Sequence, residues 1–212
     1  MSHLKKPKEY YSIDRKDVLE MIPADSNNIL DIGCGEGRLG RDLEQRGAKN
    51  LVGVERCPKA AKKAKKVFNR VLVGDIETMR FPFKRNYFDC IICADVLEHL
   101  IDPVSLLVKL KDHLKKEGCL IASIPNVQHY TVSFRLLWGQ WDYRSSGILD
   151  ETHLRFFTLK TIKDLFFRSG FLIVKIKRNY LVSKWAKVLT LNLIRLFKGF
   201  STYQYRIVAK KR

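Results

Sequence analysis

The stretch that decides the fold is ILDIGCGEG, residues 29–37. It begins with an apolar run, which is typical of a buried strand, and continues through Gly33, Gly35 and Gly37. Glycine adopts positive φ without strain and leaves no side chain between the backbone and a ligand. The amides at the start of the following helix add a partial positive charge. The order of strand, glycine turn and helix predicts a ligand-binding βα unit.

Similar units follow along the chain. Apolar runs that predict strands alternate with helix-like spacing, which indicates an α/β fold with a parallel sheet. We expect a helix over 102–118, because lysines cluster in its last turn and Gly118 can end it. Strands are expected at 27–33, 50–55, 70–75, 87–94, 118–125, 171–180 and 202–212, and other helices at 38–47, 57–68 and 158–169.

The composition suits a single domain over 1–212. Apolar residues make up 46% and aromatic residues 11% of the 212 residues, enough for a sizeable core. The net charge of +18 favours anionic partners such as RNA, an acidic membrane surface or an acidic substrate. A solvated basic surface without a partner explains the charge equally well.

The cysteines are expected to be reduced core thiols. Cys90 and Cys93 stand three apart inside a predicted strand, so they face opposite sides of the sheet and do not share a metal. Free thiols, the absence of a signal-like start and the absence of any apolar run near 18 residues predict a cytoplasmic protein without a spanning helix.

Acidic residues stand where predicted strands end. Glu55 ends the second strand, Asp75 ends the third, and Asp31 lies at the junction of the first strand with the glycine loop. Ligands of open α/β sheets bind beyond these strand ends. Glu55 can accept two hydroxyl hydrogens and Asp75 can accept from an exocyclic amine. Asp31 either orients the ligand or braces the glycine turn.

With these motifs the chain resembles the class I S-adenosylmethionine-dependent methyltransferases, from about residue 10 to its end. The resemblance implies a Rossmann-like seven-stranded sheet, order 3-2-1-4-5-7-6, with the last strand antiparallel and helices on both faces. It implies that Glu55 binds the ribose and that Asp75 with Ile76 reads the adenine. The full cofactor set that it implies is Asp31, Gly33, Cys34, Gly35, Gly37, Glu55, Arg56, Asp75, Ile76 and Asp95.

A second constellation follows the fourth predicted strand. Asp95, Glu98 and His99 have i, i+3, i+4 spacing, so one helical turn can present them together, and His153 can fold over the same rim. Such a mixed oxygen and nitrogen set can bind a divalent metal without selecting one. Without a metal, Asp95 caps a helix and His99 is a general base or a structural donor. Either way His99 and His153 are the expected catalytic residues, with Asp150 a weaker candidate.

The acid-x-x-Glu-His pattern resembles that of small-RNA terminal 2′-O-methyltransferases and of ubiquinone-biosynthesis O-methyltransferases. In the first group a later histidine precedes an aromatic pair, as His153 precedes Phe156 and Phe157. The resemblance implies a metal that binds vicinal hydroxyls and acidifies one of them. Asp95 departs from the glutamate usual in those groups, which puts its part in the metal site in doubt.

Residues 126–157 are rich in aromatic side chains and predict an acceptor-binding lid of loops and short helices. Within them GILDETHLRFFT, residues 147–158, resembles small bacterial and archaeal methyltransferases associated with glycan biosynthesis. Trp138, Trp141 and Tyr143 either stack on an acceptor or form the core of the lid. A basic amphipathic pattern at 181–200 predicts a helix that packs on the sheet or lies peripherally on an anionic membrane.

We therefore expect methyl transfer to a hydroxyl of a small molecule or glycan. RNA 2′-O-methylation with a divalent metal is the alternative activity, although no RRM, KH or zinc-knuckle signature accompanies it. A non-catalytic, cofactor-binding or membrane-associated accessory protein is the alternative outside enzymes.

Overall fold

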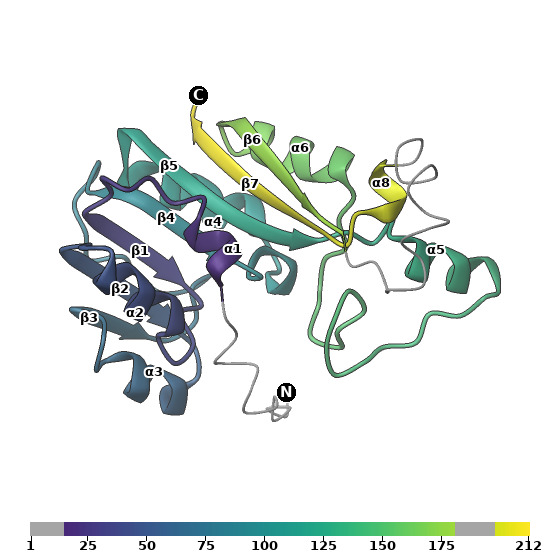
Figure 1. Ribbon diagram of the computed structural model, residues 1–212, viewed down its shortest axis with the longest axis horizontal. Helices are drawn as coiled ribbons and strands as arrows, with labels where there is room; N and C mark the ends of the chain where they lie inside the picture. Colours follow the sequence, from purple (N-terminus) through teal and green to yellow (C-terminus); the bar gives the residue numbers. More distant parts are fainter. Residues whose placement is uncertain (1–14, 181–197) are drawn as a thin grey trace.

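The fold is built on seven strands in the order β3-β2-β1-β4-β5-β7-β6 (Figure 1). The structure is a computed structural model that describes residues 15–180 and 198–212. β7 runs antiparallel to both of its neighbours, whereas the other neighbouring strands are parallel. The predicted order and the antiparallel last strand are both confirmed. The strands are β1 (Asn28–Ile32), β2 (Asn50–Glu55), β3 (Arg70–Val73), β4 (Phe88–Ala94), β5 (Leu114–Pro125), β6 (Phe171–Asn179) and β7 (Gln204–Lys211).

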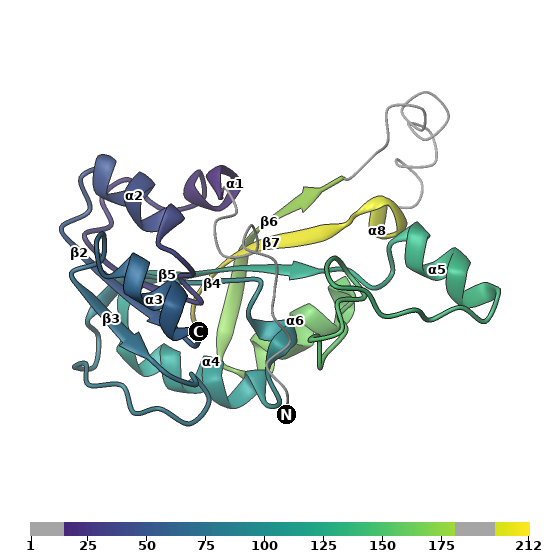
Figure 2. The same ribbon diagram turned by 90° about the horizontal axis from the view of Figure 1, so that it is seen from below.

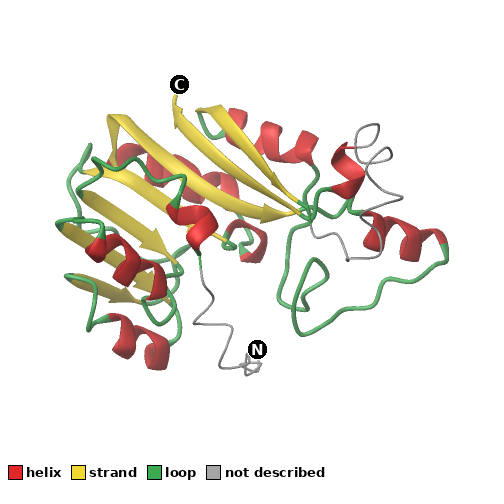
Figure 3. Cartoon of the chain, in the orientation of Figure 1, coloured by secondary structure: helices red, strands yellow, loops and turns green. Residues whose placement is uncertain are grey.

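Helices cover both faces of the sheet, and each face has its own apolar core (Figure 3). Alternation along the strands sends Ile29 to one core and Leu30 to the other. Cys90 and Cys93 likewise fall in different cores, as their spacing predicts, and all five cysteines are free. One face carries α1 (Lys16–Leu19), α2 (Arg38–Gln45) and α3 (Pro58–Ala64), and the other carries α4 (Pro103–His113) and α6 (Leu159–Arg168).

The helix predicted over 102–118 is shorter than expected. α4 ends at His113, and β5 begins at the next residue, so Gly118 lies inside a strand and is not a helix cap. Leu114 pairs with Phe88 of β4, and both side chains are completely buried. Lys115 forms an ion pair with Asp89 of β4 at 2.6 Å. These contacts with β4 exist only in the folded sheet, and they override the helical pattern of the local sequence.

The segment 126–157 projects from the carboxyl end of the sheet (Figure 2). It contains α5 (Tyr130–Leu137) and a long loop, whose small core is formed by Val132, Ile148 and Leu149. Its start is fixed to the sheet by Asn126, whose side-chain amide donates to the carbonyls of Gly199 and Thr202. These bonds hold the start of the segment beside the residues that lead into β7.

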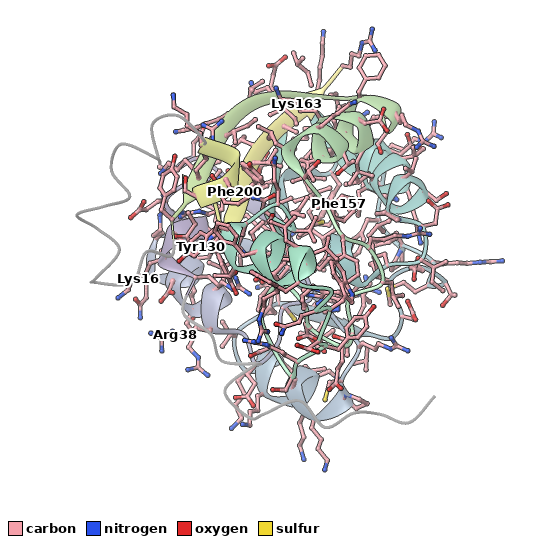
Figure 4. All side chains as sticks on the ribbon, turned by 90° about the vertical axis from the view of Figure 1, so that its right-hand side faces the viewer. Lys16, Arg38, Tyr130, Phe157, Lys163 and Phe200 are labelled. Carbon is pink, nitrogen blue, oxygen red and sulfur yellow. The ribbon has the colours of Figure 1, made fainter. Side chains whose placement is uncertain are left out.

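α8 (Lys198–Ser201) lies beside α5, where Figure 4 labels Phe200 and Tyr130. The rings of Phe200 and Phe134 meet edge to face, with centroids 5.5 Å apart. Of the amphipathic helix predicted at 181–200, residues 181–197 lie outside the described residues. No helix in the described ranges is long and apolar enough to cross a membrane.

Candidate cofactor and acceptor site

A cavity of about 950 Å³ opens at the carboxyl ends of the central strands. Its wall is formed by the glycine loop, the ends of β2 and β4, the short helix η2 (Leu97–His99) and the loop around 146–153. The two predicted constellations, one near the glycine loop and one after β4, therefore share a single cavity. This is the edge at which an open α/β sheet binds its ligands.

The glycine loop needs glycine for its conformation. Gly33, Gly35 and Gly37 have φ of 73°, 55° and 86°, all in the left-handed region. A Cβ on Gly33 would lie 3.0 Å from Cγ2 of Val96, so the side chain of Val96 would have to shift to admit one. Cys34 is buried and its thiol lies against Gly53, which leaves its backbone as the part that can face a ligand.

Glu55 is held by backbone amides on both of its carboxylate oxygens. Oε2 accepts from the amide of Gly35 at 2.9 Å, and Oε1 accepts from the amide of Cys57 at 2.7 Å. Burial raises the pKa of Glu55, and these amide bonds oppose that rise. Glu55 lines the cavity, and each of its carboxylate oxygens can accept a further hydrogen bond from that side. The carboxylate is thus oriented to accept two hydroxyl hydrogens.

The predicted adenine-reading residues also line the cavity. Asp75 accepts from the amide of Glu77 at 3.0 Å through Oδ1, and its Oδ2 lies 3.8 Å from the guanidinium of Arg56. Ile76 is buried beside it, and Arg56 is largely exposed at the rim. Polar and apolar groups therefore stand side by side in this part of the cavity wall.

Asp31 and Arg15 form the charged floor of the cavity. Asp31 is 4% exposed, and burial raises its pKa to about 7, with the nearby positive charge of Arg15 opposing the rise. Arg15 lines the cavity and forms an ion pair with Asp95 at 2.5 Å. Arg15 was not predicted, because it precedes the first strand and belongs to no recognisable motif. Tyr203, just before β7, and Gln204, its first residue, also line the cavity and belong to no recognisable motif.

Asp95 does not have the role in a helix cap that its spacing predicts. Its φ is 53°, so the chain turns sharply after β4, and the N-cap of η2 is Val96, without a side-chain cap. Oδ1 accepts from Ser123 at 2.8 Å and from Gln204 at 2.5 Å, while Oδ2 pairs with Arg15. These contacts direct the carboxylate toward β5 and β7. Asp95 lines the cavity on the cofactor side and lies outside the group formed by the other three predicted metal ligands.

Glu98, His99 and His153 are brought together, with one ligand atom of each within 4.8 Å of the others. Glu98 is 1% exposed, and within the described residues no hydrogen bond reaches either of its carboxylate oxygens. Its Oε1 lies 4.0 Å from Nε2 of His153. Burial and the charge of Asp95 raise the pKa of Glu98 well above its usual value. A buried carboxylate without donors is unfavourable, and a cation between these side chains would relieve it.

Both histidines are oriented through Nδ1. That atom lies 3.1 Å from the carbonyl of Thr152 in His99 and 2.9 Å from the carbonyl of Ile148 in His153. A carbonyl only accepts, so Nδ1 carries the proton and Nε2 of the neutral ring presents a lone pair. Outer hydrogen bonds of this kind are usual around metal-binding histidines.

The aromatic candidates of the lid lie outside the part of the cavity wall formed by described residues. Trp138 is 82% exposed, and Trp141 packs edge to face against Phe156 in the lid core. Tyr143 is exposed. His129 is buried, contacts Thr131, and has its pKa lowered to about 4 by burial. Asp150, in contrast, lines the cavity and is buried there.

A family model described as a methyltransferase domain matches residues 8–176. A mitochondrial ubiquinone biosynthesis O-methyltransferase of Schizosaccharomyces pombe is 35% identical over 104 residues, which are 45% of this chain and 36% of that protein. A ubiquinone biosynthesis O-methyltransferase of Cereibacter sphaeroides is 23% identical over 165 residues, 73% of this chain and 64% of that protein. The match thus spans less than two thirds of either curated relative.

Solved structures share the fold. A SAM-dependent methyltransferase from Archaeoglobus fulgidus has a TM-score of 0.69 at 22% identity, covering 97% of this chain and 95% of that one. An S-adenosylmethionine-dependent methyltransferase from Mesorhizobium loti has a TM-score of 0.67 at 16% identity, covering 92% of this chain and 96% of that one. At these identities the likeness establishes the architecture and leaves the acceptor open.

Proposed function

The chain belongs to the S-adenosylmethionine-dependent methyltransferases, and from this premise we propose that it methylates a hydroxyl oxygen of a small molecule or glycan. The observation that carries the choice is the group of Glu98, His99 and His153 in the same cavity as the cofactor loop. Two imidazoles and a carboxylate can bind and deprotonate a hydroxyl. The names of the two curated relatives, both O-methyltransferases, support the same acceptor atom.

The cofactor residues are assigned by the chemistry of their surroundings. S-adenosylmethionine supplies an activated methyl group on a sulfonium when it is bound. The backbone of the glycine loop makes room for it, Glu55 accepts the ribose hydroxyls, and Asp75 with Ile76 faces the adenine. Asp31 attracts the ammonium group and Arg15 the carboxylate of the amino-acid end. This places opposite charges of the protein and the cofactor in contact along the floor of the cavity.

A divalent metal fits the acceptor side. Glu98 offers an oxygen without hydrogen-bond donors, and the two histidines offer nitrogens whose orientation is already fixed. A metal bound there would lower the pKa of a coordinated hydroxyl. Without a metal, Glu98 and His153 position the acceptor, and the Nε2 lone pair of His99 takes its proton. With a metal, that lone pair would bind the ion, and His99 would position the acceptor instead of taking its proton.

The test is a methyl-transfer screen over vicinal diols, quinols, glycans and RNA, after chelation and after return of Mg²⁺, Mn²⁺ or Zn²⁺. We expect transfer to a hydroxyl acceptor that chelation abolishes and one of these ions restores. Activity that survives both chelation and His99→Ala would contradict the metal and the general-base roles together. Methylation of RNA, with an affinity that falls steeply with salt, would favour the RNA alternative. Cofactor binding without turnover on any class would favour an accessory protein.

The exposed side of the lid supports a further proposal, peripheral contact with an anionic membrane. Phe134, Leu136, Leu137 and Trp138 are between 53% and 82% exposed, and the chain carries a net charge of +18. A cluster of exposed apolar side chains on a basic protein is typical of an interfacial segment. Sedimentation with phosphatidylglycerol vesicles should exceed that with phosphatidylcholine vesicles and should drop in Leu137→Asp. Equal sedimentation of both proteins would contradict this contact.

A further inference from the structure

Hydrogen bonds join the loop 150–155 to η2 and to the residues just after it. The amides of Leu154 and Arg155 both donate to the carbonyl of Glu98, at 2.8 and 2.9 Å. The guanidinium of Arg155 donates to the carbonyl of Ile101. These bonds fix the backbone of the loop beside His99 and His153. A loop side chain that faces His99 is therefore held at a defined distance from its ring.

Thr152 is the side chain in that position, and it also contacts Asp150. Its amide and its hydroxyl both donate to Oδ1 of Asp150, at 2.8 and 2.7 Å. Its hydroxyl oxygen lies 3.1 Å from Nδ1 of His99, and its carbonyl oxygen lies 3.1 Å from the same atom. Because the hydroxyl hydrogen points to Asp150, the hydroxyl oxygen acts as an acceptor toward His99.

We propose that Thr152 is a positioning residue, which couples the buried carboxylate of Asp150 to His99 through a carboxylate–hydroxyl–imidazole chain. The chain acts beside the carbonyl of Thr152 in holding the proton of His99 on Nδ1, and it directs the Nε2 lone pair toward Glu98 and the acceptor. A hydrogen bond to a charged group strengthens the next bond in such a network. The inference rests on the proposed function for its catalytic meaning, while the state of the imidazole can be measured without turnover.

The rival explanation is that Asp150 and Thr152 merely shape the turn of the loop. Substitutions that keep or remove the Thr152 hydroxyl distinguish the two explanations. Thr152→Ser keeps the hydroxyl, and Thr152→Val keeps the shape without it. Asp150→Asn keeps an acceptor oxygen but removes the charge. Thr131→Val is a matched control, because the Thr131 hydroxyl lies 2.8 Å from Nδ1 of His129, a buried histidine that does not line the cavity.

The experiment records the imidazole nitrogen signals of the metal-free, full-length protein by nuclear magnetic resonance, followed by calorimetric titration with Mn²⁺ and Zn²⁺. The wild type and Thr152→Ser should show His99 as the Nδ1–H tautomer alone. Thr152→Val keeps the carbonyl that accepts from Nδ1, so it should keep the Nδ1–H tautomer but show a shifted Nδ1 signal. It should also bind the ion about 10- to 100-fold more weakly, the usual effect of losing an outer-shell partner. Asp150→Asn should keep the tautomer and weaken ion binding, and Thr131→Val should change neither signal nor affinity.

Unchanged His99 signals in Thr152→Val, with circular dichroism equal to that of the wild type, would overturn the inference. If Thr152→Val does not fold, unchanged ion affinity in Asp150→Asn would overturn it instead. A wild type that binds neither ion and methylates no hydroxyl would contradict the proposed function alone, because the comparison of the His99 nitrogen signals still decides whether Thr152 positions the ring.

Discussion

A carboxylate oxygen of Glu98 lies 4.0 Å from an imidazole nitrogen of His153, and both side chains are almost completely buried. Neither oxygen of Glu98 accepts a hydrogen bond from residues 15–180 or 198–212. Burial raises the pKa of Glu98, so ionising this carboxyl costs stability, an arrangement that usually serves a function at the expense of stability. A change at Glu98 should therefore affect stability and ion binding in opposite directions.

Glu98→Gln should stabilise the metal-free protein and weaken binding of divalent ions. The folded-state pKa of Glu98 is raised, so its charge opposes folding once the pH exceeds its unfolded value. The stability of the wild type should fall as the pH rises through the folded pKa, and that of Glu98→Gln should fall less. Denaturant unfolding at pH 5 and pH 8 checks this, with the exposed Glu151→Gln as control. An equal response to pH in wild type and Glu98→Gln would contradict it.

Asp31 should make cofactor binding depend on pH. Its pKa is about 7 in the protein without ligand, and a cationic ligand favours the ionised form. Affinity for S-adenosylmethionine should therefore rise between pH 6 and pH 8, with proton release detectable by calorimetry in two buffers. In Asp31→Asn the pH dependence should be lost. A pH-independent affinity in the wild type would contradict the placement of the ligand's ammonium group.

Asp31 should also lower the free energy of unfolding at neutral and alkaline pH relative to acid pH. The folded pKa of about 7 lies above the ordinary value of 3.8, so stability present at acid pH is lost as the pH rises between these values. At about 1.4 kcal/mol per unit, the effect reaches about 4 kcal/mol. Unfolding of Asp31→Asn and wild type should therefore differ more at pH 8 than at pH 4. A constant difference would show that Asp31 is ionised throughout.

Arg15→Ala should weaken binding of S-adenosylmethionine by about 10- to 100-fold, the effect of losing a charged hydrogen bond. Arg15 lines the cavity and is oriented by Asp95. Lys16→Ala removes the same charge from a neighbouring, exposed position and should have no such effect. Calorimetry on both variants, with circular dichroism to verify folding, measures the difference. Equal affinities would remove Arg15 from the cofactor site.

The strands of the parallel sheet, the glycine loop and the position of Glu55 were predictable because each depends on local sequence, whereas the sheet order was implied by the family resemblance. An apolar run and its following turn occupy a few consecutive residues, and the strand-end acids follow directly from them. The end of α4 was not predictable in this way, since Leu114 leaves the helix to pair with Phe88, which lies in another strand. The local periodicity of the sequence does not indicate that Leu114 pairs with Phe88.

The candidate site was predicted in its residue types more than in its contacts. Spacing brought Glu98 and His99 together correctly, and the resemblance added His153. Spacing failed for Asp95, because the positive φ of that residue turns its side chain toward Ser123 and Arg15. Arg15 and Thr152 act through contacts with residues distant in sequence, so only the folded chain reveals them.

The most direct test of the account is calorimetric titration of S-adenosylmethionine into the wild type, Glu55→Ala and Glu36→Ala. Glu36 is an acid of the same loop that pairs with Lys63 and lies outside the cavity wall. We predict that the wild type and Glu36→Ala bind alike and that Glu55→Ala binds about 10- to 100-fold more weakly, because both ribose hydroxyls lose their acceptor. Equal affinity of all three proteins, or no binding to the wild type, would contradict the account.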